Sequence, residues 1–297
     1  TTQGANSAQS PENKFLFSAC FVALIATAFG FIIRTLIIND LGAEFNLSET
    51  QKGEILGVGL WPFAISIVLF SLVIDKIGYG RVMAFAFVCH MLAGVITIFA
   101  NGYNMLYVGT FIMTLGNGAV EAVINPVVAT MFTKDKTRWL NALHAGWPGG
   151  LVVGGVIALA LGPEADWQWK VGLVFVPTVA YGIMMFGRKF PVHERVAAGV
   201  SYQTMLREVG IIGALIIVAL MTFEVGRVFN FASFGTLPIG NIPLLNVLMI
   251  AAVVAVFAFY VRSFGRPLFI FLLLVMIPLA TTELGTDSWI TPLMETE

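Results

Sequence analysis

The sequence predicts an all-α polytopic membrane protein, and three observations support that fold class. Of the 297 residues, 58% are hydrophobic and only 11% are charged, whereas soluble domains are about 25% charged. The hydrophobic residues gather in nine runs, each near or above the roughly 20 residues that a spanning helix needs. The runs do not alternate with a period of two, and only a helix satisfies its own backbone inside lipid within one segment. This pattern excludes a soluble enzyme and a disordered tail, and a net charge of −1 gives no basic field for nucleic acid.

The predicted elements begin after a polar tail. Residues 1–14 lack the basic start and short apolar core of a signal peptide, so we expect a short cytoplasmic tail. Each following element is predicted as a helix because it is a long apolar run bounded by polar residues. In chain order these runs are 15–38, 53–74, 82–100, 103–132, 139–161, 169–187, 209–228, 243–261 and 267–293.

The basic residues in the connections predict the orientation. Lys and Arg are retained on the cytoplasmic side of membrane proteins. With the N-terminus inside, three basic residues fall outside (Lys52, Lys170 and Arg227), and Arg34 lies within the first run. We therefore expect a multi-pass protein of the inner (cytoplasmic) membrane with a cytoplasmic N-terminus. The basic residues placed inside are Lys14, Lys76, Arg81, Lys134, Lys136, Arg138, Arg188, Lys189, Arg195, Arg207, Arg262 and Arg266.

A polar connection divides the chain. Residues 188–208 follow six runs and form the longest internal connection, so they are predicted to be a cytoplasmic linker. Before it lies a six-helix domain at 15–187. After it lie two additional helices at 209–262 and a ninth helix with the C-terminus at 263–297. The part after the linker looks incomplete, and we expect either a longer natural chain or a second chain that completes the fold.

The fourth run carries a polar stripe. Ionisable groups inside a membrane span are expensive and are therefore candidates for function. Asn117, Glu121 and Asn125 are spaced four residues apart, which predicts one helical face, and Pro126 leaves a backbone carbonyl without its usual donor. One interpretation is a solute cavity in which Glu121 carries a proton or accepts a hydroxyl. The other is a buried carboxyl that only stabilises packing.

Two further positions could face the same cavity. Arg34, near the outer end of the first run, either reaches the membrane interface or pairs with Glu121 across the cavity. Asn141 and His144 are three residues apart, and the histidine could titrate near physiological pH or serve only in packing. The glycines that follow, at 149, 150, 154 and 155, have a spacing that permits close helix contact.

The last run holds two carboxylates. Glu283 and Asp287 are four residues apart, so they either form a cation, proton or sugar-hydroxyl site or are solvated near the outer surface. Glu224 and Arg227 are expected to form an interfacial pair. Cys20 and Cys89 lie inside apolar runs, and the three histidines are scattered, so we expect no metal site, no cofactor and no catalytic residues. The sequence is not that of an enzyme.

The second connection carries a resemblance to a known family. It contains Asp75, Lys76, Gly78 and Arg81, and it resembles the signature loop of the major facilitator superfamily between helices two and three. In that family the acidic and basic residues of this loop latch helix ends together on the cytoplasmic side. The resemblance implies the same role for these four residues.

A second match resembles one branch of that family. The sequence Gly116-Asn117-Gly118-Ala-Val-Glu121 to Pro126, followed by Leu140 to Gly150, is similar to the fucose–galactose–glucose:proton symporters. The resemblance covers roughly residues 15–190. It implies that Glu121 lines the central cavity and takes part in proton coupling. The run 267–293 resembles the seventh helix of that branch.

Two functions are compatible with these features. The first is a solute transporter, for example a sugar/proton symporter, that works by alternating access with the lipid bilayer, a small polar solute and protons as its partners. The second is a truncated, transporter-derived scaffold or accessory subunit of a larger membrane complex, without transport activity. Other membrane subunits are possible partners under either hypothesis, and nucleic acid is not.

Overall fold

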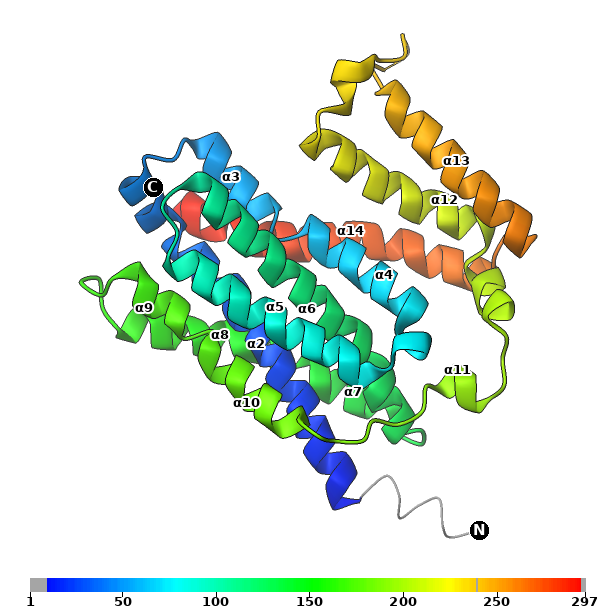
Figure 1. Cartoon of the computed structure of the whole chain (residues 1–297), viewed down its shortest axis with the longest axis horizontal. Coiled ribbons are helices and arrows are strands. Elements are labelled where there is room, and N and C mark those ends of the chain that lie inside the picture. Colours follow the sequence, from blue (N-terminus) through cyan, green and yellow to red (C-terminus); the bar gives the residue numbers. More distant parts are fainter. Residues whose placement is uncertain (1–9, 239, 295–297) are drawn as a thin grey trace. The chain divides into compact units, whose positions relative to one another are not determined.

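The computed structural model describes residues 10–238 and 240–294, with side chains up to Glu283. Throughout this part of the chain the regular structure is helical, with no β-strand and one isolated bridge between Thr236 and Pro243 (Figure 1). The helices form two compact units. One contains the described residues up to Glu194, and the other comprises Arg195–Trp289. The boundary between the units lies inside the predicted linker at 188–208.

The first unit contains the six predicted runs of the N-terminal domain. Three of these runs form single helices, whereas the second, fifth and sixth are each broken into two. A short helix, α11 (Glu194–Ala197), follows at the boundary between the units. The helices of the first unit are α2 (Pro11–Phe45), α3 (Glu49–Gly57), α4 (Trp61–Ile77), α5 (Tyr79–Ile98), α6 (Tyr103–Met131), α7 (Lys136–His144), α8 (Gly146–Ala160), α9 (Trp167–Gly172) and α10 (Phe175–Met185).

Proline explains the break in the second run. Pro62 has no N–H group for the carbonyl of Val58, four residues earlier, so the helix cannot continue regularly through this point. The hydroxyl of Thr114 on α6 donates to that carbonyl at 3.2 Å. Pro148 stands in the same relation to His144, the last residue of α7. A side chain from a neighbouring helix thus replaces a backbone donor inside the unit.

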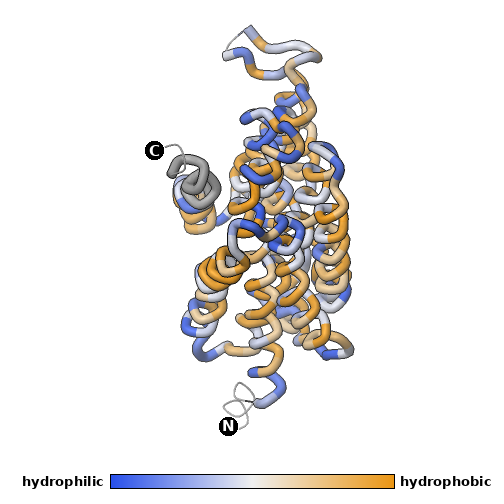
Figure 2. Tube along the Cα trace, turned by 90° about the vertical axis from the view of Figure 1, so that its left-hand side faces the viewer, coloured by the Kyte–Doolittle hydropathy of each residue, from blue (hydrophilic) through white to orange (hydrophobic). Residues whose placement is uncertain are grey.

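Seven helical segments of the described chain are long and apolar enough to cross a membrane. The run 169–187 is not among them, and the described apolar part of the last run, Pro267–Glu283, is shorter. Figure 2 shows long hydrophobic stretches along the helices, with hydrophilic residues concentrated in their connections. The chain is therefore an all-α, multi-pass membrane protein.

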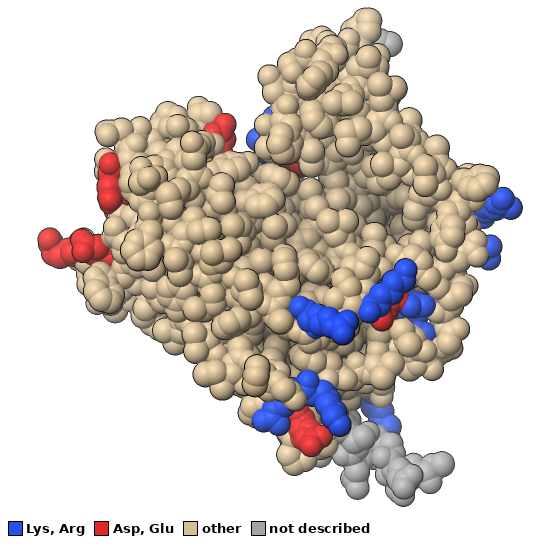
Figure 3. Space-filling view, viewed as in Figure 1, with Lys and Arg blue, Asp and Glu red and all other residues tan. Residues whose placement is uncertain are grey.

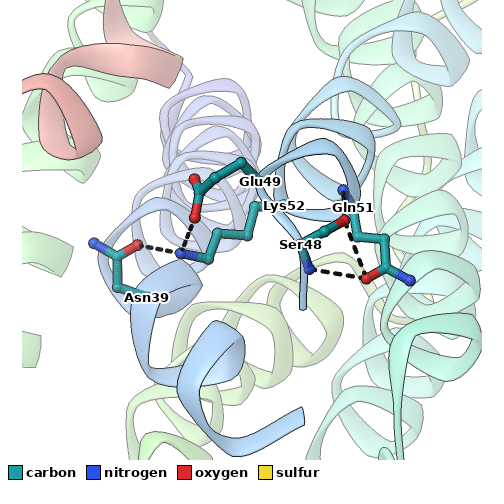
Figure 4. A network of polar contacts seen from close by, with 5 residues as sticks. All are labelled: Asn39, Ser48, Glu49, Gln51 and Lys52. Atoms are coloured by element: carbon teal, nitrogen blue, oxygen red, sulfur yellow. Dashed lines mark hydrogen bonds and ion pairs between the residues drawn. The ribbon is translucent and has the colours of Figure 1, made fainter. Parts of the chain in front are cut away.

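A polar corner joins α2 to α3. Asn46 ends α2 in the left-handed conformation, and Ser48 begins α3 with a capping box in which its hydroxyl accepts from the N–H of Gln51 at 3.2 Å. Lys52 donates to Asn39 on α2 at 3.3 Å and pairs with Glu49 at 2.8 Å (Figure 4). These contacts set the direction in which the chain re-enters the helical unit.

The core of the first unit forms around α2 and α6. Helix α6 packs against α4 and α5, and α2 packs against α8 and α10. A Cβ on Gly118 of α6 would lie 2.5 Å from the carbonyl oxygen of Phe63 and 2.6 Å from Cβ of Ser66, so α4 and α6 approach backbone to backbone. This close approach fixes the rotation of α6 about its axis.

The glycines of α8 make the close helix contact that their spacing predicts. Gly146, Gly150 and Gly154 are buried at intervals of four residues, and each lies against α2. A Cβ on Gly150 would be 2.7 Å from Cβ of Ala28 and 3.3 Å from Cα of Ile25. The stripe therefore holds α8 directly on α2, as small residues do in membrane helices.

Charges in the first unit are distributed unevenly between its two ends. In Figure 3, acidic side chains lie over the region of α3 and α9, and most basic side chains of this unit lie toward the ends of α7 and α10. The sequence agrees with this distribution. The connections at one end of the helices carry mainly Lys and Arg, and those at the other end carry mainly Asp and Glu. The acidic set comprises Asp40, Glu44, Glu49, Glu54, Glu164 and Asp166, and the basic set comprises Lys76, Arg81, Lys134, Lys136, Arg138, Arg188 and Lys189.

The second unit contains α12 (Tyr202–Val228), the short helix η1 (Phe231–Phe234), α13 (Leu244–Val261) and α14 (Pro267–Met294) up to Trp289. Helix α12 packs against α13. Gly210 of α12 has a φ of 63°, and this left-handed residue marks a kink. Glu224 and Arg227 form the ion pair that their spacing predicts, at 2.9 Å.

We expect Gly150→Ala to lower the unfolding temperature of the detergent-solubilised protein. The added methyl group overlaps Ala28, and overpacking of this kind costs about 1–3 kcal/mol. The matched control is Gly149→Ala in the same turn, where no described atom outside the helix lies within 4 Å of the new Cβ. Equal unfolding temperatures for the two variants would contradict the proposed contact between α8 and α2.

Candidate functional site

A hydrogen-bonded chain of three side chains connects α6 to α7. The side-chain amide of Asn125 donates to Oε2 of Glu121 at 2.9 Å and to the backbone carbonyl of the same residue at 3.2 Å. Its oxygen, Oδ1, lies 2.9 Å from Nε2 of His144. Since a carbonyl oxygen can only accept, this arrangement places the proton of the imidazole on Nε2. A half-buried carboxylate is thereby linked to an exposed imidazole.

These three hydrogen-bonded side chains can bind a hydroxylated solute and exchange a proton. Glu121 and Asn125 are half-buried, whereas His144 and Asn141 on α7 are exposed at the surface of the first unit. Carboxylate, amide and imidazole together offer both donors and acceptors. The Asn125 amide cannot carry a proton, but it orients the two titratable groups on either side of it.

Asn117 takes no part in the hydrogen bonds that link Glu121 to His144. The residue is 4% exposed, and its side chain contacts His90 on α5 rather than Glu121. The imidazole of His90 on α5 lies beside it, because a Cβ on Gly116 would be 2.9 Å from His90 Nε2. The expected three-residue face is therefore divided into an exposed pair and a buried asparagine.

His90 is a buried polar residue that the sequence analysis did not single out. It is fully buried, and its Nδ1 lies 3.1 Å from the hydroxyl of Tyr181 on α10. Its ring also contacts the side chain of Asn117 on α6. The signal was available, since a histidine in the middle of the apolar run 82–100 is an ionisable group within a span.

Arg34 neither reaches the surface nor pairs with Glu121. It is only 8% exposed, and its Cζ lies 5.2 Å from the centroid of the Phe31 ring. A side chain on Gly59 would overlap its guanidinium group. Within the described residues the guanidinium makes no ion pair, and its Nε has no hydrogen-bond partner. Arg34 is instead a buried cation, so neither of the two positions expected for it from the sequence is observed.

Arg34 lines a small cavity of about 40 Å³ at a different level from Glu121. On α6 the cavity reaches residues 106 to 113, so its last contact is eight residues before Glu121. At about 1.5 Å per residue, the two levels differ by roughly 12 Å along that helix. The candidate cavity residues thus form two separate polar positions in the first unit.

The remaining candidates lie elsewhere. Glu283 is exposed on α14 in the second unit, and Asp287 lies outside the residues whose side chains are described. Cys20 and Cys89 are buried thiols without a disulfide. In the part of the chain that the structure describes, no group of three or more His, Cys, Asp or Glu residues could hold a metal ion.

The signature loop forms a tight turn between α4 and α5. Gly78 is its only non-helical residue, with a φ of 90° that favours glycine. Asp75 is half-buried at the end of α4, Lys76 is exposed, and Arg81 donates to the carbonyl of Ile77 at 3.4 Å. The four predicted latch residues therefore surround one turn at the basic end of the unit.

The irregular segment 188–194 packs onto this turn. The ring of Tyr79 lies 6.2 Å from that of Phe190 and stacks on His193 at 6.0 Å between centroids. Glu194 pairs with Lys136 at the start of α7 at 2.7 Å. Burial lowers the pKa of His193 below its ordinary value of 6.5, against the opposing effect of the Glu194 charge.

Comparison with known proteins identifies relatives over most of the chain. A family model described as "Major Facilitator Superfamily" matches residues 17–291. The cis,cis-muconate transport protein of Acinetobacter baylyi is 25% identical over 174 residues, which cover 58% of this chain and 42% of that protein. The MFS-type transporter sphD of Aspergillus fumigatus is 22% identical over 267 residues, covering 85% of this chain and 44% of the relative.

A third relative is the multidrug resistance protein D of Escherichia coli. It is 19% identical over 148 residues, which cover 49% of this chain and 37% of that protein. The chain thus spans less than half the length of each of these three relatives. By their names they are transport or resistance proteins, not enzymes.

We expect the packing of segment 188–194 on Tyr79 to weaken as the pH falls below 6.5. The lowered pKa of His193 means that the detached state binds a proton more readily, so stability is present above 6.5 and is lost below it. Hydrogen exchange of the backbone amides in this segment, corrected for intrinsic rates, should rise on acidification. In His193→Phe the stacking partner remains and the rise should disappear. A rise of the same size in this variant would contradict the assignment.

Proposed function

The chain belongs to the Major Facilitator Superfamily, and on that premise we propose that it forms one wall of the translocation path of a solute transporter. The transporter works by alternating access, and its cargo is a small polar solute. A relative that carries cis,cis-muconate supports small-solute transport. The activity of the whole protein is part of the proposal, since the chain covers less than half of these relatives.

The chain from Glu121 through Asn125 to His144 is the observation that carries this proposal. Placing a carboxylate inside an apolar unit is costly, and packing alone does not require two further polar groups from two helices to converge on it. His144 and Asn141 remain exposed on the unit, where a solute can reach them. We assign proton binding to Glu121 and solute binding to Asn125, Asn141 and His144.

The proposal includes proton coupling and accepts a sugar as one class of solute. Sugar hydroxyl groups both donate and accept, which suits a carboxylate, an amide and an imidazole placed side by side. The resemblance of residues 116–126 and 140–150 to sugar–proton symporters supports this class. The relative that carries muconate shows that other small solutes must be tested beside it.

Sidedness and the latch complete the proposed mechanism. The gathering of Lys and Arg at the ends of α7 and α10 supports a cytoplasmic location of that end and of the N-terminus. The turn with Asp75 and Gly78 then lies on the cytoplasmic side, and the segment that bears His193 covers it. In this proposal these contacts hold the helix ends together while the path is closed on that side.

We expect Glu121→Gln to abolish accumulation driven by a pH gradient while exchange of solute across the membrane persists. Net accumulation needs a group that gives up its proton, whereas exchange does not, and the amide keeps the shape and a hydrogen bond to Asn125. Uptake and counterflow of radiolabelled galactose and cis,cis-muconate in proteoliposomes measure the two activities. The control is Glu164→Gln, an exposed carboxylate in the connection after α8.

Three results would contradict parts of the proposal. Unchanged accumulation by Glu121→Gln would remove the proton role of this residue. Equal loss in Glu164→Gln would show a general effect of charge. Tight co-purification with a larger membrane complex, without uptake of any solute, would favour the accessory subunit instead.

A further inference from the structure

Arg34 is a buried charge of the first unit that has no role in the proposed site at Glu121 and His144. Its side chain is more than nine-tenths buried, and it lies in the C-terminal half of α2. A buried guanidinium without a counter-charge is destabilising, because its charge has left water and nothing compensates it. The structure must therefore offer this residue a partner in some state of the protein.

The carboxylates nearest to it along the chain have other partners. Asp40 pairs with Lys170 at 3.2 Å, Glu44 accepts from the indole of Trp167, and Glu54 accepts from the hydroxyl of Tyr103 at 2.6 Å. Glu121 lies at another level and bonds to Asn125. Among the described residues, no acidic group is thus left at this level to neutralise Arg34.

The cavity beside Arg34 can hold a carboxylate group. Its volume of about 40 Å³ exceeds the roughly 10–15 Å³ that one water molecule needs, but it is too small for a whole metabolite. Its lining is mostly aliphatic, Thr97 and Thr110 add hydroxyl groups, and Arg34 is its only charged residue. Gly59, at the break between α3 and α4, leaves the room that the guanidinium occupies.

We propose that Arg34 binds the carboxylate of the transported solute, which makes a small organic anion the solute class of this protein. Arginine presents a planar, permanently charged fork that matches a carboxylate with two hydrogen bonds. The carboxylate enters the cavity, and the rest of the solute lies outside it. This inference rests on the proposed transport function and names the chemistry of its cargo.

The test compares solutes that differ only in charge. Nicotinate and nicotinamide, and benzoate and benzamide, are matched pairs of a carboxylate and a neutral amide, and galactose serves as an uncharged sugar. Binding to the native protein is measured by thermal stabilisation and by isothermal titration, beside uptake in proteoliposomes. We expect the carboxylates to bind at least about tenfold more tightly than their amides, the scale of a charged hydrogen bond.

Substitution of Arg34 separates recognition from folding. Arg34→Gln should bring the carboxylate and the amide of each pair to equal affinity, whereas Arg34→Lys should retain part of the preference for the carboxylate. A purely structural role would weaken both members of a pair alike. A lowered unfolding temperature would show that Arg34→Gln does not fold properly. In that case Arg34→Lys and the two glycine variants test whether Arg34 recognises the carboxylate.

A matched pair of glycines tests the position without removing the charge. Gly59→Ala places a methyl group against the guanidinium and should lower carboxylate affinity selectively. Gly57→Ala, two residues earlier at the end of α3, meets no described atom within 4 Å and should bind like the native protein. Equal effects of the two variants would overturn the assignment of Arg34 to the solute.

The outcomes distinguish this inference from the function on which it rests. If galactose is bound and transported while no carboxylate binds, the anion proposal fails and transport stands. If carboxylates bind equally well to Arg34→Gln, another residue recognises the anion and Arg34 has a partner within the protein. If no solute of either class binds or is transported, the transport function itself fails.

Discussion

The amide of Asn125 donates to the carboxylate of Glu121 at 2.9 Å, and the usefulness of this hydrogen bond depends on how firmly α6 is held. Gly118 lets α6 approach the backbone of α4, and Ser66 of α4 donates to the carbonyl of Leu115 at 2.7 Å. These two contacts with α4 thus fix the rotation of α6. That rotation decides which polar groups of α6 are exposed and which are buried, and α2 and α7 bring their own polar residues to it.

Helix breaks and polar side chains occur together in this unit. Arg34 lies against the break between α3 and α4, and His144 is the last residue before the break between α7 and α8. Proline follows each break, and irregular backbone at membrane depth is tolerated only where protein or a water-filled cavity satisfies it. The breaks therefore mark the places where the apolar unit can accommodate polar groups.

The helical runs could be predicted from the sequence, because hydropathy and length decide which segments enter a bilayer. Their breaks could not, because proline alone does not mark them: Pro62 and Pro148 follow breaks, whereas Pro126 lies inside the unbroken helix α6. The bond between Glu121 and Asn125 follows from helical spacing. The place of Asn117 does not, because each step of four residues rotates by about 40°, so Asn117 and Asn125 differ by about 80°. The contacts of His144 and His90 depend on neighbouring helices, which periodicity within one helix does not describe.

The separation of Arg34 from Glu121 has a consequence for the charge that the proposed transporter moves. If these two groups paired, the loaded and the empty site would differ little in charge, and a solute would have to compete with an internal carboxylate. Because the cavity beside Arg34 ends about 12 Å from the level of Glu121 along α6, each group needs its own neutralising partner. A proton neutralises Glu121 and a carboxylate neutralises Arg34, so one anion bound together with one proton leaves both sites without net charge. Such a load crosses the apolar unit with the smallest desolvation cost, because neither buried group remains charged and uncompensated.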